Sequence, residues 1–78
     1  MNFEVIVKLK KEVLDPEGRA IQETLTRLGE KSVKAVTVSK RYVLEIEGSP
    51  QSAEELVGRV AKEYLANPVS ETYEVRKL

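Results

Sequence analysis

Residues 3–9 alternate between apolar and polar side chains, a period of two that is typical of a half-buried strand. The apolar positions, which would share one face, are Phe3, Val5, Val7 and Leu9. Ile6 is an apolar residue on the otherwise polar face. It fits either an isolated surface residue or a second sheet face that a partner covers, and the pattern does not decide between them.

A helix is predicted over residues 16–28. Asp15 is a good N-cap because its carboxylate can accept backbone N–H bonds, and Pro16 suits the first helical position because it has no N–H to satisfy. The apolar residues that recur at helical spacing are Ile21, Leu25 and Leu28. Gly29 suits the position just beyond the helix end.

Two further strands are predicted over residues 33–39 and 41–47, which are rich in β-branched residues. Because the two strands meet at Ser39-Lys40-Arg41, they are expected to form a hairpin. The turn has no Asn-Gly or Asp-Gly pair, so the sequence leaves its type open.

A second helix begins at Ser49-Pro50, where serine can cap and proline can occupy the first position. Its apolar stripe consists of Ala53, Leu56, Val57, Val60, Ala61, Tyr64 and Leu65. Gly58 lies within the stripe and costs about 1 kcal/mol of helix stability relative to alanine. Asn67-Pro68 ends the helix, and a last strand is predicted over residues 69–77.

The predicted order is therefore β-α-β-β-α-β. It indicates a single α+β domain, residues 1–78, with a ferredoxin-like antiparallel sheet of four strands and two helices on one face. A chain of 78 residues buries only about 60–65% of its unfolded surface, and this one has no disulfide to reinforce it. We therefore expect a homodimer or a higher homo-oligomer.

Composition narrows the possible chemistry. There is no Cys and no His, which excludes zinc fingers, thiol nucleophiles and Ser–His pairs. Thirteen basic and thirteen acidic residues give no net charge, which argues against binding nucleic acid. The carboxylate pairs Glu45/Glu47 and Glu54/Glu55 fit a solvated strand face and a helix N-terminus. We predict no catalytic, cofactor-binding or metal-binding residues, and we leave open whether the chain is part of an enzyme.

Basic residues could still form a local patch on the surface. The candidates are Lys8, Lys10, Lys11, Lys40 and Arg41. A solvated surface balanced by acidic residues explains them as well, and strand 41–47 does not match the aromatic signature of RNA-binding sheets. The N-terminus lacks a signal-peptide pattern, and no apolar run approaches the ~20 residues of a membrane span. We expect a cytoplasmic protein that does not enter membranes.

Three ordered segments resemble the PurS family. They are KEVLDPEGRAI at residues 11–21, continuing as LTRLG at 25–29; VTVSKRYVLE at 36–45; and LANPVSETYEV at 65–75. Together they span most of the chain. The sequence departs from the family pattern at Ser39, where Gly is usual before the lysine, and at Thr72, where an acidic residue is common.

The resemblance implies a small subunit of phosphoribosylformylglycinamidine (FGAM) synthase, in de novo purine synthesis. Such a subunit is non-catalytic and binds no cofactor, while the complex uses ATP, Mg and glutamine. It would dimerise, bridge a large synthetase subunit and a glutaminase subunit, and assist the passage of ammonia between them.

On this hypothesis the predicted hairpin turn and the segment 67–73 are the expected interface elements. The residues concerned are Lys40, Arg41, Tyr42, Asn67, Pro68, Glu71 and Tyr73. Purely structural roles stay open as alternatives to an interface role: Asn67-Pro68 could serve only to end a helix, and Tyr73 only to fill the core.

A rival hypothesis is an ACT-type regulatory module, which has the same order of elements and binds a small amino acid near its first strand–helix turn. Gly18 lies too far into the predicted helix to serve such a site well.

Overall fold

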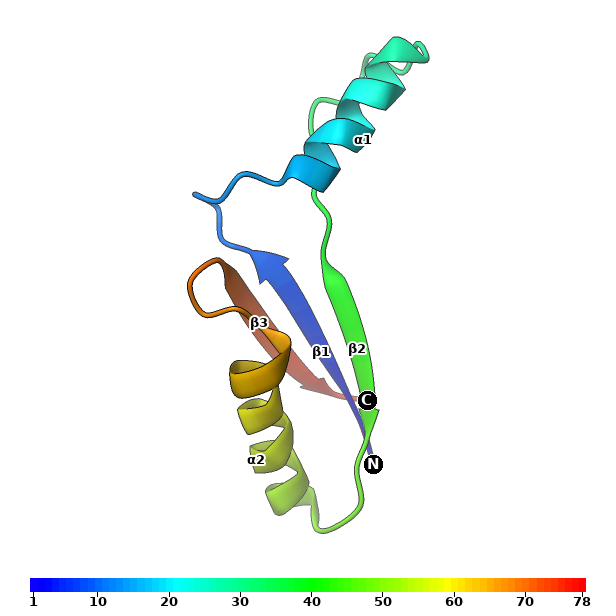
Figure 1. The fold of residues 1–78 in the computed structure, drawn as a ribbon. Coiled ribbons are helices and arrows are strands. Elements are labelled where there is room, and N and C mark those ends of the chain that lie inside the picture. The colour runs from blue at the N-terminus through cyan, green and yellow to red at the C-terminus, as the bar shows by residue number, and fades with distance from the viewer.

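A computed structural model describes residues 1–78. Its elements are β1 (Asn2–Leu9), α1 (Pro16–Arg27), β2 (Lys40–Glu45), α2 (Pro50–Val60), the short π-helix η1 (Ala61–Leu65) and β3 (Glu71–Lys77). The strands form one antiparallel sheet in the order β2-β1-β3, with β1 in the centre (Figure 1). The fold is α+β, as predicted. None of its helices has the length and apolar composition needed to cross a membrane.

The alternation in β1 produces the core. Phe3, Val5 and Val7 are buried on the sheet face that α2 covers. From α2 and η1, the buried residues in the same cluster are Ala53, Val57 and Ala61. Small alanines let the helix lie close to the sheet. Four residues of the stripe predicted for the second helix pack in this core, namely Ala53, Val57, Ala61 and Leu65, whereas Tyr64 of the same stripe is exposed.

Both ends of α1 agree with the sequence. The Asp15 side chain accepts a hydrogen bond from the N–H of Gly18 at 2.8 Å. At the other end Gly29 has φ +99°, a left-handed conformation that glycine adopts without strain. The N–H of Glu30 then returns to the carbonyl of Leu25 at 2.8 Å, which closes the helix end.

The second helix also begins and ends near the predicted residues. Ser49 caps α2 by accepting the N–H of Ser52. The last turns widen into η1, where the N–H of Ala66 donates to the carbonyl of Ala61, five residues earlier, at 3.0 Å. The chain then turns through Asn67 and Pro68 into β3.

The predicted strand 33–39 and its hairpin are wrong. This segment pairs with no strand, so the sheet has three strands instead of four. The segment runs beside α1, where the N–H of Val38 donates to the Asp15 carboxylate at 2.8 Å and the Gln22 side-chain amide donates to the carbonyl of Val33. A type I′ hairpin turn needs a positive φ at both of its central residues. In this chain only Gly29 and Gly48 have a positive φ, and neither lies between residues 33–39 and 41–47.

The expectation of two helices on one sheet face is also wrong for the single chain. Only α2 covers the sheet, while α1 projects beyond the end of β1 and β2 (Figure 1). We call residues 14–38, which include α1 and the extended segment beside it, the arm. The radius of gyration is 16.1 Å, whereas a compact chain of this length would have about 11.5 Å.

Candidate functional site

The two predicted interface segments lie far apart in the sequence but meet at one end of the sheet. Val7 of β1 is opposite Lys40 on β2 and opposite Tyr73 on β3. Two residues further along β1, Leu9 is opposite Glu71. Antiparallel pairing on both sides of β1 thus places the starts of β2 and β3 at the same end of the sheet, with β1 between them, next to the base of the arm.

The residues at the start of β2 point to different faces. Tyr42 is opposite Val5 and packs, partly buried, against the core. Arg41 lies on the other face and forms an ion pair with Glu4. Lys40 is exposed at the edge. Of these residues, Lys40 and Arg41 present charge to the surface, whereas Tyr42 contributes mainly to packing.

The turn before β3 is held by its own side chains. The N–H of Asn67 donates to the Glu71 carboxylate at 2.7 Å, and the Asn67 side-chain oxygen accepts the N–H of Val69 at 2.9 Å. The Lys10 ammonium donates to the carbonyl of Pro68 at 3.0 Å and ties the turn to the end of β1. Asn67 and Pro68 therefore do shape the helix end, and they also fix the loop in one place on the surface.

Two cavities open between this sheet end and the base of the arm. The larger, about 320 Å³, is lined by Lys8, Leu9, Lys10, Lys11, Val13, Asp15, Thr37, Val38 and Ser39. The smaller, about 200 Å³, is lined by Val7, Leu9, Asp15, Pro16, Glu17, Val38, Ser39, Lys40 and Glu71. Four of the five basic residues singled out from the sequence thus line cavities at the base of the arm, mixed with carboxylates.

Asp15 lines both cavities. Its pKa is below the ordinary value because the carboxylate accepts the N–H of Gly18 and, next in importance, the N–H of Val38. The carboxylate is thereby used as a structural acceptor that joins α1 to the following segment. The sequence predicted the first of these bonds and missed the second.

Gly18 has a role that the sequence analysis also missed. A Cβ atom at this position would overlap the backbone carbonyl oxygen of Val36, so glycine lets the extended segment approach α1. The only sign of this close approach in the sequence was a glycine in the first turn of a predicted helix.

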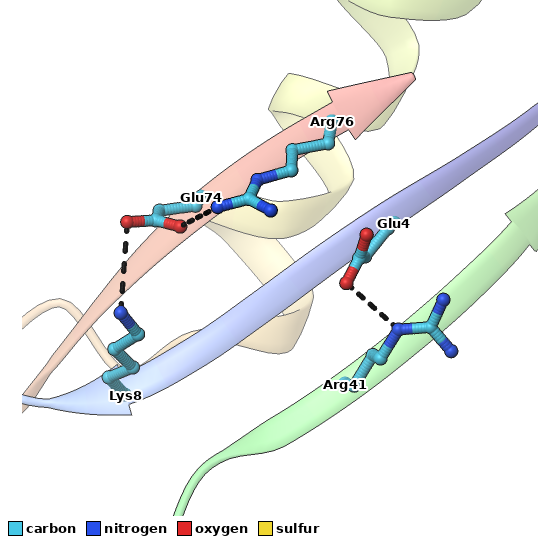
Figure 2. Close-up of polar contacts among 5 residues, drawn as sticks. All are labelled: Glu4, Lys8, Arg41, Glu74 and Arg76. Atoms are coloured by element: carbon cyan, nitrogen blue, oxygen red, sulfur yellow. Dashed lines mark hydrogen bonds and ion pairs between the residues drawn. The ribbon is translucent and has the colours of Figure 1, made fainter. Parts of the chain in front are cut away.

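The sheet face opposite α2 carries a group of charged side chains (Figure 2). Arg41 Nε donates to Glu4 Oε1 at 2.8 Å, and only 12% of the Glu4 side chain is exposed. Glu74 lies between Lys8 and Arg76 at 3.7 Å and 3.5 Å. The site as a whole offers lysines, arginines, carboxylates and tyrosines on a surface, an arrangement suited to docking.

Comparison with known proteins gives a consistent result. Residues 2–78 match the PurS family model, described as phosphoribosylformylglycinamidine (FGAM) synthase. The FGAM synthase subunit PurS of Methanocaldococcus jannaschii is 45% identical over 73 residues, which cover 92% of this chain and 88% of that protein.

Solved structures agree with the family match. The crystal structure of M. jannaschii PurS, a subunit of formylglycinamide ribonucleotide amidotransferase, superposes with a TM-score of 0.86 at 43% identity and covers 96% of this chain and 92% of that one. A chain in the structure of PurLQS from Thermotoga maritima superposes with a TM-score of 0.75 at 34% identity, covering 99% and 95%.

Proposed function

The chain belongs to the PurS family of FGAM synthase subunits, and from this premise we propose that it acts as the non-catalytic subunit that bridges the synthetase and glutaminase subunits and assists ammonia transfer. The observation that carries the proposal is the match over residues 2–78, joined by the likeness to a chain of the T. maritima PurLQS structure. Because residues 1–78 would form one domain, the chain would dock onto the other subunits as a single unit.

The residue chemistry supports a non-catalytic role. Release of ammonia from glutamine by covalent catalysis needs an activated nucleophile such as a thiolate, and the 78 residues contain no Cys and no His. The strongest candidate base by position, Asp15, is engaged by two backbone N–H groups. We therefore propose that ATP, Mg and glutamine bind to the other subunits, and we propose the cytoplasm as the place where the complex works.

The docking surface that we propose is the sheet end where β2 and β3 begin. Lys40 and Tyr73 flank Val7 there, and the Asn67–Glu71 turn borders them. Tyr73 is 39% exposed, so it presents an apolar ring with a polar tip. An aromatic anchor with a polar rim is a common arrangement in protein interfaces.

We further propose that the arm pairs with a second copy. Its apolar residues Leu14, Ile21 and Leu28 are exposed, its segment 33–38 has unused strand-forming capacity, and the outer edge of β2 is unpaired. In a pair of chains, the arm of each copy would add the missing strand and the missing helix to the other copy's sheet. This exchange would complete the four-stranded, ferredoxin-like layer with two helices on one face.

Reconstitution with purified synthetase and glutaminase subunits tests the bridging role. Glutamine-dependent FGAM formation should require this chain, whereas ammonia-dependent formation by the synthetase should not. Lys40→Glu should lower the glutamine-dependent rate at least tenfold, because it reverses a charge at the proposed surface.

Lys77→Glu is the matched control, since Lys77 lies on the same sheet face at the opposite end, opposite Phe3. Equal rates for K40E and wild type would remove Lys40 from the docking surface. Full glutamine-dependent activity without the chain would contradict the bridging role itself.

A further inference from the structure

The larger of the two cavities at the base of the arm has a lining whose chemistry the proposed function does not use. We call it the arm-base cavity. Its volume is about 320 Å³, which is within the range of pockets that hold small molecules. It is lined by the end of β1, by the turn that follows it and by residues 37–39, which lead from the arm into β2 (Figure 1). The cavity therefore lies where the sheet and the arm meet.

Cations outnumber anions in the arm-base cavity. Three lysines line it, Lys8, Lys10 and Lys11, and Asp15 is its one carboxylate. Both oxygens of Asp15 already accept backbone N–H groups, each at 2.8 Å, and these bonds offset part of its negative charge. The lining therefore presents a net positive charge to anything that enters the cavity.

The three ammonium groups keep donors for a ligand. Lys11 takes part in none of the four ion pairs. Lys10 gives one N–H to the carbonyl of Pro68 and retains two more. Lys8 lies 3.7 Å from Glu74 in an exposed pair of the kind that adds little stability (Figure 2). Because a lysine ammonium sits on a flexible stem, all three can turn toward an anion in the cavity.

The rest of the lining consists of hydroxyl groups and apolar side chains. The hydroxyls belong to Thr37 and Ser39, and the apolar side chains to Leu9, Val13 and Val38. Hydroxyls donate to anionic oxygens without adding charge. A phosphate monoester has the matching division, a charged group with several oxygens at one end and an organic part at the other.

Backbone hydrogen bonds hold both walls of the arm-base cavity. On one wall the N–H of Val13 donates to the carbonyl of Lys10 at 3.0 Å, and the N–H of Lys10 donates to the carbonyl of Ser70 at 2.9 Å. On the other wall the N–H of Val38 donates to Asp15 at 2.8 Å. A ligand would therefore meet walls that are already formed, which lowers the cost of binding.

We propose that the arm-base cavity binds a small phosphate monoester, with the phosphate on the lysines and hydroxyls and the organic part against the apolar side chains. Three lysines and one aspartate give the lining a charge of +2, and a phosphate monoester carries about −1.5 to −2 at pH 7. A carboxylate has a single charge and only two oxygens, fewer than the donors around the cavity. The inference goes beyond the proposed function, because it adds a small-molecule ligand to a chain whose proposed role is docking.

Titration of the full chain, followed by the amide resonances in nuclear magnetic resonance spectra, tests the site. The probe is phenyl phosphate, which joins a phosphate to an apolar ring. Amides of residues 8–15 and 37–39 should shift, whereas those of α2 should not. Phenol, which lacks the phosphate, should shift none of them. Inorganic phosphate should bind the same residues several times more weakly than phenyl phosphate, because it makes no contact with the apolar side chains.

Removal of two lysine charges tests the assignment of residues. Lys10→Gln combined with Lys11→Gln should raise the dissociation constant for phenyl phosphate at least about tenfold, because two charge-assisted hydrogen bonds are lost. The matched control is Lys62→Gln combined with Lys77→Gln, which removes the same charge from exposed residues that line neither cavity. Lys11→Gln alone should weaken binding by a smaller factor. It keeps the contact between Lys10 and Pro68, so it reports on the cavity even if the double variant disturbs that turn.

Four outcomes would overturn the proposal. The first is no amide shift with phenyl phosphate up to about 10 mM. The second is equal affinity for succinate, a dianion without phosphorus, which would show that the lysines attract any anion of that charge. The third is an equal loss of binding in the double variant and its control. The fourth is equal affinity for inorganic phosphate and phenyl phosphate, which would exclude a role for the apolar side chains. None of these measurements depends on whether the chain bridges larger subunits.

Discussion

Asp15 shows how one side chain can serve two elements. Its carboxylate caps α1 through Gly18 and also holds the N–H of Val38, twenty-three residues later in the sequence. Both bonds favour the ionised form, so the pKa of Asp15 in the folded protein lies below its ordinary value of 3.8. A lowered pKa contributes stability that is present above the ordinary value and is lost as the pH falls through the folded value.

This linkage predicts a pH-dependent effect of Asp15→Asn. Asparagine has one carbonyl oxygen and no charge, so it replaces only part of the capping and cannot hold both N–H groups equally. The variant should have a lower free energy of unfolding than wild type near pH 7. The difference should shrink as the pH falls below about 3.8, where Asp15 of the unfolded wild-type chain becomes protonated, and should continue to shrink until the folded carboxylate is protonated at its lower pKa. Urea unfolding at several pH values measures it, and a difference that stays constant down to pH 2 would contradict the assignment.

At the level of the element, the arm is a helix and an extended segment that approach closely at Gly18. Gly18→Ala should destabilise the arm by about 1–3 kcal/mol, because the new methyl group must displace the backbone of Val36. Gly58→Ala is the contrasting change, since a Cβ at that site in α2 meets nothing within 4 Å. It should stabilise the protein by about 0.5–1 kcal/mol.

Hydrogen exchange of the amides in residues 16–38 measures the first effect, and thermal unfolding measures the second. If Gly18→Ala leaves exchange in the arm unchanged, the close approach of segment and helix is not a structural requirement. A destabilising Gly58→Ala would indicate instead that a second copy occupies the space beside α2.

The sequence predicted those features that short-range chemistry determines. Asp15, Gly29 and Ser49 set helix ends within a few residues of themselves, and the alternation from Phe3 to Leu9 identified the buried face of β1. The strand predicted over residues 33–39 was wrong, because strand pairing depends on neighbours that are distant in sequence.

The candidate site was predictable to a similar extent. Lys40 and Tyr73 were chosen as surface elements by resemblance, and the sheet brings them into one row with Val7. The cross-strand bond between Arg41 and Glu4 could not be predicted, because no local pattern in the sequence fixes the register of β2 against β1. The role of Lys40 and Tyr73 in docking stays a prediction.

For the whole molecule, the extents of 51 × 24 × 14 Å describe a body too elongated to bury the apolar face of α1. If a second copy covers that face, stability follows protein concentration by mass action. The unfolding temperature of wild type should rise by several degrees between low and high micromolar concentrations. Ile21→Asp should abolish this dependence, because it puts a charge into the proposed contact.

Glu23→Lys, an exposed change two residues after Ile21 on the same helix, is the control for this measurement and should keep the concentration dependence. Calorimetry at each concentration gives the unfolding temperatures. A wild-type transition that does not move with concentration would mean that the arm does not join two copies.

An arm that stands apart from its own sheet also has a genetic consequence. If each sheet is completed by the other chain's arm, every pair contains two independent composite units, each built from two polypeptides. A chain with a damaged arm and a chain with a damaged sheet would together form one intact unit and one doubly damaged unit. Two alleles that each fail alone should then partly complement each other in the same cell, with at most about half of the composite units restored in mixed pairs.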